Sequence, residues 1–185
     1  MDRKEFLKNT FKGAVAAAVL PCCAGLLQAD TAKCAEPAPS CDAAFLRDWL
    51  SNFVAKEEPK LGRDAAVKLL EERGRACCRS LEFRQKLIKD SNGSLEKLVE
   101  LMGKIVGPEN CHLEGNKVTL IYPTDRCRCG WSPQRAPTPD DPYCECSKSN
   151  NQYLFEIVTG KKVQAEITES PRRGQSHCKF IIQVG

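Results

Sequence analysis

The C-terminal stretch KVQAEITESPRRGQSHCKFIIQVG (residues 162–185) decides the fold, because it places two strand-like runs on either side of a turn. Val163, Ala165 and Ile167 alternate with polar residues, which is the period of a half-buried strand. Residues 178–184 form a second apolar run, and the intervening segment 171–174 has turn composition. Two strands joined in this way are expected to pair antiparallel.

Upstream of this pair, residues 117–122 alternate in the same way and follow a turn signal at residues 114–116, so they predict another strand. A short helix is predicted over 147–159, ended by Gly160. Residues 127–143 contain four prolines and predict a loop, which needs additional interactions to fix its position.

The N-terminal half carries helical signals, with helices predicted over 41–56, 63–75, 81–89 and 94–105. Gly107 and Pro108 close the last of them. The first helix has a stripe that predicts a buried core face, formed by Phe45, Leu46, Trp49, Leu50 and Phe53. The predicted fold class is α+β: an N-terminal helical layer (41–107), then a cysteine-rich region (108–185) with an antiparallel sheet and one or two helices.

The first residues have the composition of an export signal. Arg3, Lys4, Lys8 and Lys12 precede a short apolar run at 13–20, and 27–29 resembles a cleavage site, so we expect a signal over 1–29 and a linker over 30–40. Residues 2–8 resemble the twin-arginine motif, with Lys4 where the second arginine is usual. This resemblance implies the twin-arginine export machinery and a periplasmic or cell-envelope location.

Three other interpretations stay open for this segment. It could be a general secretory signal or an amphipathic N-terminal helix. The third is a lipid anchor at Cys22 or Cys23, although Pro21 before Cys22 fits a lipoprotein processing site poorly.

Charge and hydropathy argue against a nucleic-acid partner and against a transmembrane domain. The chain has a net charge of +4 without a basic block, which disfavours nucleic acid. Its longest apolar run is far shorter than the roughly 20 residues of a membrane-spanning helix, so no transmembrane domain is expected.

The chemistry of the chain lies in its 12 cysteines. Cys127 and Cys129 form one Cys-x-Cys pair, and Cys144 and Cys146 form a second across the proline-rich loop. Four thiolates can close a tetrahedral zinc site, which would fasten a loop that has little core of its own. The same sulfurs could hold an iron–sulfur cluster or form two disulfides, as oxidising compartments favour.

A second cysteine motif, Cys77-Cys78, lies at the end of a predicted helix among Arg73, Arg75 and Arg79. Adjacent positions on a helix point about 100° apart, so one thiol can face the core and the other a cleft. The arginines would favour the thiolate of the exposed one, a candidate nucleophile or fifth metal ligand. The alternative is that both cysteines are small buried hydrophobic residues.

The two histidines, His112 and His177, each abut a cysteine and are the candidate bases for such a nucleophile. The alternative is that both are surface side chains. A further pair, Cys34 and Cys41, is close enough in sequence to form a disulfide.

Residues 144–184 resemble the C-terminal half of the 4-vinyl-reductase-like small-molecule-binding domain. The matching elements are Cys144 to Ser147, Phe155-Glu156, Gly160 to Val163, Glu166 to Glu169, Gly174 and His177 to Phe180. The resemblance implies a zinc site that adds Cys178 to the candidate ligands, with Ser170 where relatives often carry another cysteine. The helical half followed by this segment also resembles the L-2-amino-thiazoline-4-carboxylic acid hydrolase group of bacterial proteins.

Three functions follow as hypotheses. The first is an exported protein of structural or small-ligand-binding role, in which zinc or an iron–sulfur cluster is bound by Cys127, Cys129, Cys144, Cys146 and Cys178. The second is a hydrolase of small C–N bonds, with Cys77 or Cys78 as nucleophile and His112 or His177 as base. The third is an exported domain stapled by disulfides, without metal.

Overall fold

The computed structural model describes residues 43–127 and 132–185, and these described residues belong to one compact unit. The predicted export signal and linker, together with Cys22, Cys23, Cys34, Cys41 and Cys129, lie outside the described residues. Within the described part, no helix combines the length and apolar character needed to cross a bilayer.

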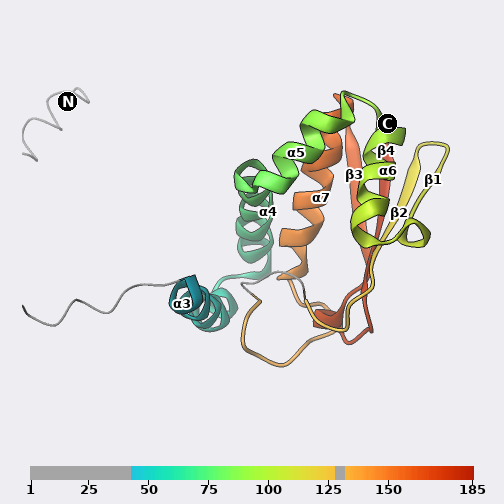
Figure 1. Ribbon diagram of the computed structural model, residues 1–185. Coiled ribbons are helices and arrows are strands. Elements are labelled where there is room, and N and C mark those ends of the chain that lie inside the picture. The colour runs from blue at the N-terminus through green and yellow to red at the C-terminus, as the bar shows by residue number, and fades with distance from the viewer. Residues whose placement is uncertain (1–42, 128–131) are drawn as a thin grey trace, which may run out of the picture. The chain divides into compact units, whose positions relative to one another are not determined.

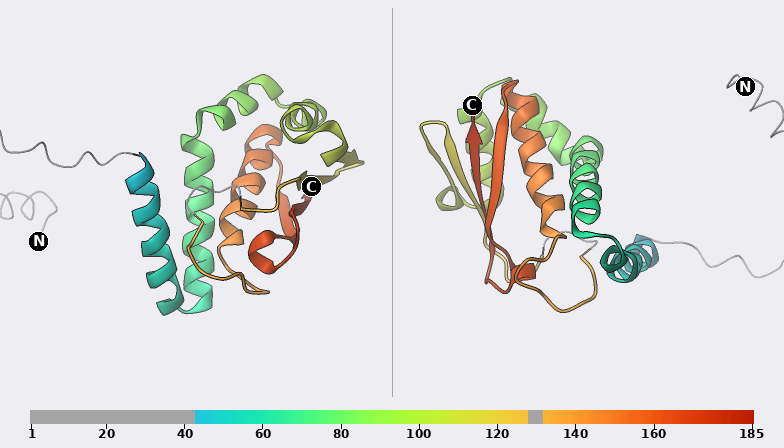
Figure 2. Two further views of the ribbon diagram at one scale, coloured as in Figure 1. Left: turned by 60° about the horizontal axis from the view of Figure 1, so that its bottom comes forward. Right: turned by 180° about the vertical axis from the view of Figure 1, so that it is seen from behind.

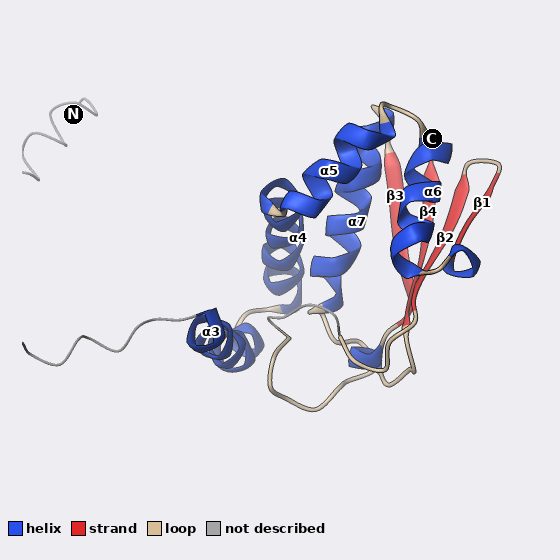
Figure 3. Cartoon of the chain, in the orientation of Figure 1, coloured by secondary structure: helices blue, strands red, loops and turns tan. Residues whose placement is uncertain are grey.

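The predicted α+β class is confirmed (Figures 1 and 3). The first half is helical: α3 (Ala43–Glu57), the 3-10 turn η1 (Glu58–Lys60), α4 (Arg63–Ser80), α5 (Glu82–Ser91), α6 (Leu95–Val106) and η2 (Pro108–Asn110). The second half contains β1 (Cys111–Glu114), β2 (Lys117–Tyr122), α7 (Cys144–Thr159), β3 (Val163–Glu169), η3 (Pro171–Arg173) and β4 (Cys178–Val184). Helix α4 continues five residues beyond its predicted end, and β1 is a strand that the sequence did not predict.

The strands form one antiparallel sheet in the order β1-β2-β4-β3. The predicted pairing of the two C-terminal strands is confirmed, with Ile167 opposite Phe180. Val118, Leu120, Phe180 and Ile182 are buried, while the residues between them are partly exposed, so one face of the sheet meets the core.

Helices α6 and α7 cover that face, α6 over β1 and β2 and α7 over β3 and β4. Helix α4 packs on α7 from the far side, and Figure 2 shows it between α3 and α7. Helix α6 begins where Ser94 accepts a hydrogen bond from the Lys97 amide (3.1 Å), and it ends at Gly107, whose φ of 98° favours glycine.

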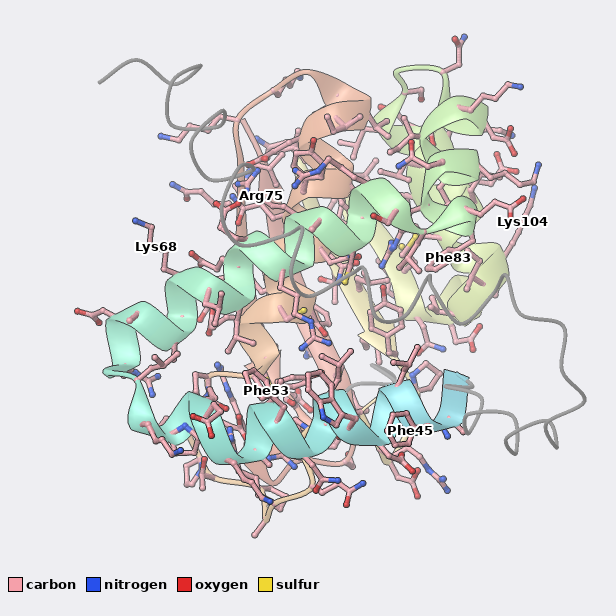
Figure 4. The ribbon with its side chains drawn as sticks, turned by 90° about the vertical axis from the view of Figure 1, so that its left-hand side faces the viewer. Phe45, Phe53, Lys68, Arg75, Phe83 and Lys104 are labelled. Carbon is pink, nitrogen blue, oxygen red and sulfur yellow. The ribbon has the colours of Figure 1, made fainter. Side chains whose placement is uncertain are left out.

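The prediction that the stripe of α3 is core is wrong. Phe45, Trp49 and Phe53 are 54%, 54% and 51% exposed, Leu46 is exposed as well, and only Leu50 of the stripe is partly buried. Figure 4 labels Phe45 and Phe53 on this helix. Helix α3 buries the opposite side instead: Ser51 donates to the carbonyl of Ser132, and Val54 packs against a small cluster around Leu70. The helical period was right, but the side of α3 that meets the rest of the protein carries Ser51 and Val54 and not most of the apolar stripe.

Buried charges hold the described part of that loop in place. Arg172 donates to Asp141 from Nε (3.0 Å) and Nη2 (2.5 Å), and its Nη1 donates to the carbonyl of Arg135 (2.8 Å). Arg135 pairs with the other Asp141 oxygen (2.8 Å) and also with Glu58. That same Asp141 oxygen accepts the Tyr143 amide (3.0 Å), directly before α7. This contact explains why α7 starts at Cys144, three residues before its predicted start.

Replacing Asp141 by Asn should destabilise the protein strongly, because Asp141 is fully buried and Arg172 would lose its counter-charge. Removing one partner of a buried ion pair costs about 3–5 kcal/mol of the free energy of unfolding. The matched control is Asp140→Asn, since Asp140 is mostly exposed and pairs with Arg63 at the surface. Urea unfolding should show a much lower midpoint for Asp141→Asn only, and equal midpoints for the two variants would contradict this assignment.

Candidate functional site

A cavity of about 380 Å³ lies between the ends of α4, α5 and α6, the start of α7 and the strands β2 and β4. Its apolar wall is formed by Leu81, Phe83, Met102, Ile105 and Phe180. Phe83 and Ile105 are about half-exposed and form the rim, whereas Met102 and Phe180 are buried. Figure 4 views the molecule from the side on which Phe83 lies.

The remaining lining residues carry polar groups and sulfur. The polar residues are Arg84, Tyr122, Ser147, Asn150 and Asn151, and the cysteines are Cys77, Cys127, Cys146 and Cys178. These side chains come from both halves of the chain, so the cavity forms only when the helical layer packs on the α7 and sheet region.

The crossing of α4 and α7 brings Cys77 and Cys146 to the lining of the cavity. Gly74 lies at the crossing, where a Cβ atom would collide with the Cys146 carbonyl and meet the Asn150 amide at 2.9 Å. Asn150 donates to the Gly74 carbonyl (3.1 Å), and Ser149 donates to the Glu71 carbonyl (2.8 Å). Gly74 therefore permits the close approach of the α4 and α7 backbones, and the hydrogen bonds of Ser149 and Asn150 then fix it.

The polar centre of the cavity is a triangle of Arg84, Tyr122 and Asn151. Arg84 Nη2 donates to Tyr122 Oη (3.3 Å) and to Asn151 Oδ1 (3.0 Å), and Tyr122 Oη donates to the same amide oxygen (3.0 Å). Asn151 is held in turn by a hydrogen bond to the Ser147 carbonyl (3.1 Å). Arg84 is 6% exposed, and its Nε is buried without a hydrogen-bond partner.

No carboxylate within residues 43–127 and 132–185 pairs with Arg84, which is the one charged residue among those described that line the cavity. A guanidinium is always charged in a protein, and burying a charge without a counter-charge is costly. An uncompensated cation in an otherwise mostly apolar cavity is the main electrostatic feature of the site.

The two adjacent cysteines of α4 face different surroundings, as their spacing predicts. Cys78 is fully buried in the main core, and Cys77 is half-buried and lines the cavity. Burial raises the pKa of the Cys78 thiol, against the opposing charges of Arg84 and Arg79. The neighbouring Arg75 and Arg79 lie over the ring of Tyr153, and Arg75 also pairs with Glu156 (3.0 Å).

The structure distributes the predicted metal ligands over two places. Cys127, Cys146 and Cys178 line the cavity, whereas the Cys144 sulfur contacts the Ser170 hydroxyl at 2.9 Å. Within the part of the chain that the structure describes, no cluster of three or more His, Cys, Asp or Glu side chains is arranged to hold a metal ion. No disulfide joins two of the seven cysteines in that part.

Neither histidine lines the cavity. His112 is exposed on β1, next to the buried Cys111, as alternation along a strand predicts. His177 Nε2 lies 3.1 Å from Glu169 Oε2, and its Nδ1 lies 2.9 Å from the Ser176 hydroxyl. The nucleophile and base proposed for a hydrolase are therefore not brought together around the thiol that faces the cavity.

Sequence reasoning missed Arg84, Tyr122 and Asn151. The available signal was Arg84 itself, which lies one helical turn before Leu87 on the buried face of α5, where an apolar residue is usual. Tyr122 ends a strand and Asn151 is inside a helix, so nothing local marks them as neighbours of that arginine.

No family model matches the chain, and none of the curated proteins matches it. Among solved structures, the chain is similar to the phenol-responsive sensory domain of the transcription activator PoxR, solved with phenol. The similarity covers 76% of this chain and 73% of that one, with 12% sequence identity and a TM-score of 0.43.

The thiols of the described residues should differ sharply in reactivity. Burial raises the pKa of Cys111 to about 11 and raises those of Cys78 and Cys144 as well, so these groups stay protonated at pH 8. Alkylation requires the thiolate, and Cys77 is the more accessible of the α4 pair. Pulsed iodoacetamide labelling read by peptide mass spectrometry should modify Cys77 at least about tenfold faster than Cys78 or Cys111.

Labelling in urea is the control for this experiment, because unfolding removes the differences in burial and should bring the three rates together. Equal rates in the folded protein would contradict the described environments.

Proposed function

We propose that this chain is a small-molecule-binding protein whose ligand occupies the cavity between α4, α5, α7 and the sheet. The observation that carries the proposal is the composition of the cavity: a mostly apolar wall with one convergent group of polar side chains around Arg84. Ligand sites in proteins typically have this composition, and their volumes range from about 300 to 1,000 Å³. A volume of about 380 Å³ suits a compact ligand such as a single substituted ring.

The walls also explain how such a ligand would be held. Phe83, whose ring has the Arg84 guanidinium over one face, and Phe180 offer aromatic surface, and Met102 offers a polarisable sulfur, all of which favour an aromatic or aliphatic body. Tyr122 and Asn151 are already oriented by their mutual hydrogen bond, so the ligand would meet a preorganised polar group.

Filling the rim should block binding. Ile105→Trp places a large ring at the mouth of the cavity and should weaken the binding of single-ring aromatic compounds by at least about tenfold, which ligand-observed NMR can measure. The matched control is Ile157→Trp, because Ile157 is equally exposed (46% against 47%) but does not line the cavity. The proposal fails if no compound of a panel of neutral and charged single-ring aromatics binds, or if both tryptophan variants bind as the unmodified chain does.

A second candidate function is metal binding, and one observation favours it: Cys127, Cys146 and Cys178 line the same cavity, together with Cys77. Cys129 lies outside the described residues and would have to complete a ligand set with them. Zinc or an iron–sulfur cluster on these thiolates would fasten the proline-rich loop in addition to the ion pairs that hold it. The twin-arginine route proposed from the sequence would allow loading before export.

Elemental analysis of protein purified without oxygen tests this candidate. About one zinc per chain, or iron with a visible absorption band, is expected, and Cys127→Ser and Cys146→Ser should each lower the metal content. Cys111→Ser is the control, because Cys111 is a buried cysteine of β1 that does not line the cavity. Metal-free protein, or equal metal content in all three variants, would exclude a site built on these cysteines.

A further inference from the structure

We propose that the cavity selects small monocarboxylates with an apolar body, and that Arg84 receives the carboxylate. This inference rests on the proposed small-molecule-binding function and names the class of ligand. It is carried by a guanidinium that lines the cavity, is 6% exposed, forms no ion pair among the described residues and has a buried Nε without a partner.

The same protein shows what a buried arginine looks like when its role is structural. Arg172 is buried to the same degree as Arg84, at 7% exposed, but Asp141 neutralises it and backbone carbonyls accept its remaining donors. Among the described residues, Arg84 contacts neither a carboxylate nor a backbone carbonyl: its Nη1 donates to the Met102 sulfur (3.7 Å), and its guanidinium lies over the ring of Phe83, 5.1 Å from the centroid. A ligand carboxylate would supply both the missing charge and the missing acceptor.

The fold does not require Arg84 in order to satisfy its neighbours. Tyr122 and Asn151 are hydrogen-bonded to each other, and Asn151 also donates to the Ser147 carbonyl. A structural arginine is expected where neighbouring acceptors have no other hydrogen-bond donor. Here Tyr122 and Asn151 hold the guanidinium by hydrogen bonds and also have hydrogen bonds that do not involve it. This arrangement suits a group held in position for a ligand.

The surroundings limit the charge and the body of that ligand. Because Arg84 is the one charged residue lining the cavity among those described, it balances a single negative charge. A phosphate ester carries nearly two at neutral pH and would leave one uncompensated in a mostly apolar site. The remaining wall, with Phe83, Met102 and Phe180, favours a hydrocarbon or aromatic body attached to the carboxylate.

Benzoate and benzamide test the proposal, because they share shape and size but differ in charge. Titrations of the full chain at pH 7.5, followed by ligand-observed NMR, should show benzoate binding at least about tenfold more tightly than benzamide, and more tightly than phenyl phosphate. Arg84→Gln should lower the benzoate affinity by at least about tenfold and leave benzamide nearly unchanged. Arg84→Lys should give an intermediate benzoate affinity, because lysine keeps the charge but not the planar fork.

Arg79→Gln is the matched control, since Arg79 is an exposed arginine that lies over Tyr153 and does not line the cavity. It should bind both ligands as the unmodified chain does. A thermal unfolding midpoint for unliganded Arg84→Gln at or above that of the unmodified chain would further support a ligand-binding role, because the variant loses an unpaired buried charge.

The outcomes separate this inference from the function on which it rests. Equal binding of benzoate and benzamide by the unmodified chain would overturn carboxylate selection and leave the small-molecule site standing, and this comparison needs no variant to fold. Unchanged benzoate affinity in Arg84→Gln would overturn the role of Arg84. If neither ligand nor any neutral aromatic compound binds, both proposals fail.

Discussion

The buried ion pair between Asp141 and Arg172 is the constraint on which the rest of the structure depends. It joins the proline-rich loop to the turn between β3 and β4, and the same carboxylate accepts the Tyr143 amide at the start of α7. The loop has few apolar residues with which to pack, so a hydrogen-bonded charge pair fixes it where a core cannot. Because α7 begins directly after this contact, the pair also sets where the Cys146 side chain enters the cavity.

The second constraint is the close crossing of α4 and α7 at Gly74. Two helices usually pack with side chains between them, but here the backbones approach more closely, and Ser149 and Asn150 reach across to α4 carbonyls. Those carbonyls keep their helical geometry, so the hydrogen bonds add order without breaking either helix. The crossing brings Cys77 and Cys146 to the same cavity and leaves Cys78 in the core, so the adjacent residues Cys77 and Cys78 have different environments.

The sequence predicted what depends on local periodicity and missed what depends on long-range packing. Alternation located β2 and β3, an apolar run located β4, and helical spacing located α3 to α6 to within about five residues, because these signals lie within each segment. The stripe of α3 shows the limit: periodicity identifies an apolar face but not whether another element covers it. Likewise, Arg84, Tyr122 and Asn151 come from three separate elements, and only the folded chain brings them together.

The contrast between the two buried arginines is the strongest functional evidence in this molecule. A protein this small can bury a guanidinium at low cost, as Arg172 shows, by giving it a carboxylate and several carbonyls. At Arg84 the described residues provide an amide oxygen, a phenol, a thioether and the ring of Phe83, none of them charged. The cost of burying that charge therefore remains largely uncompensated in the unliganded protein. Since a neutral side chain of similar size would avoid this cost, the arginine is best explained by an anion that enters the cavity from outside.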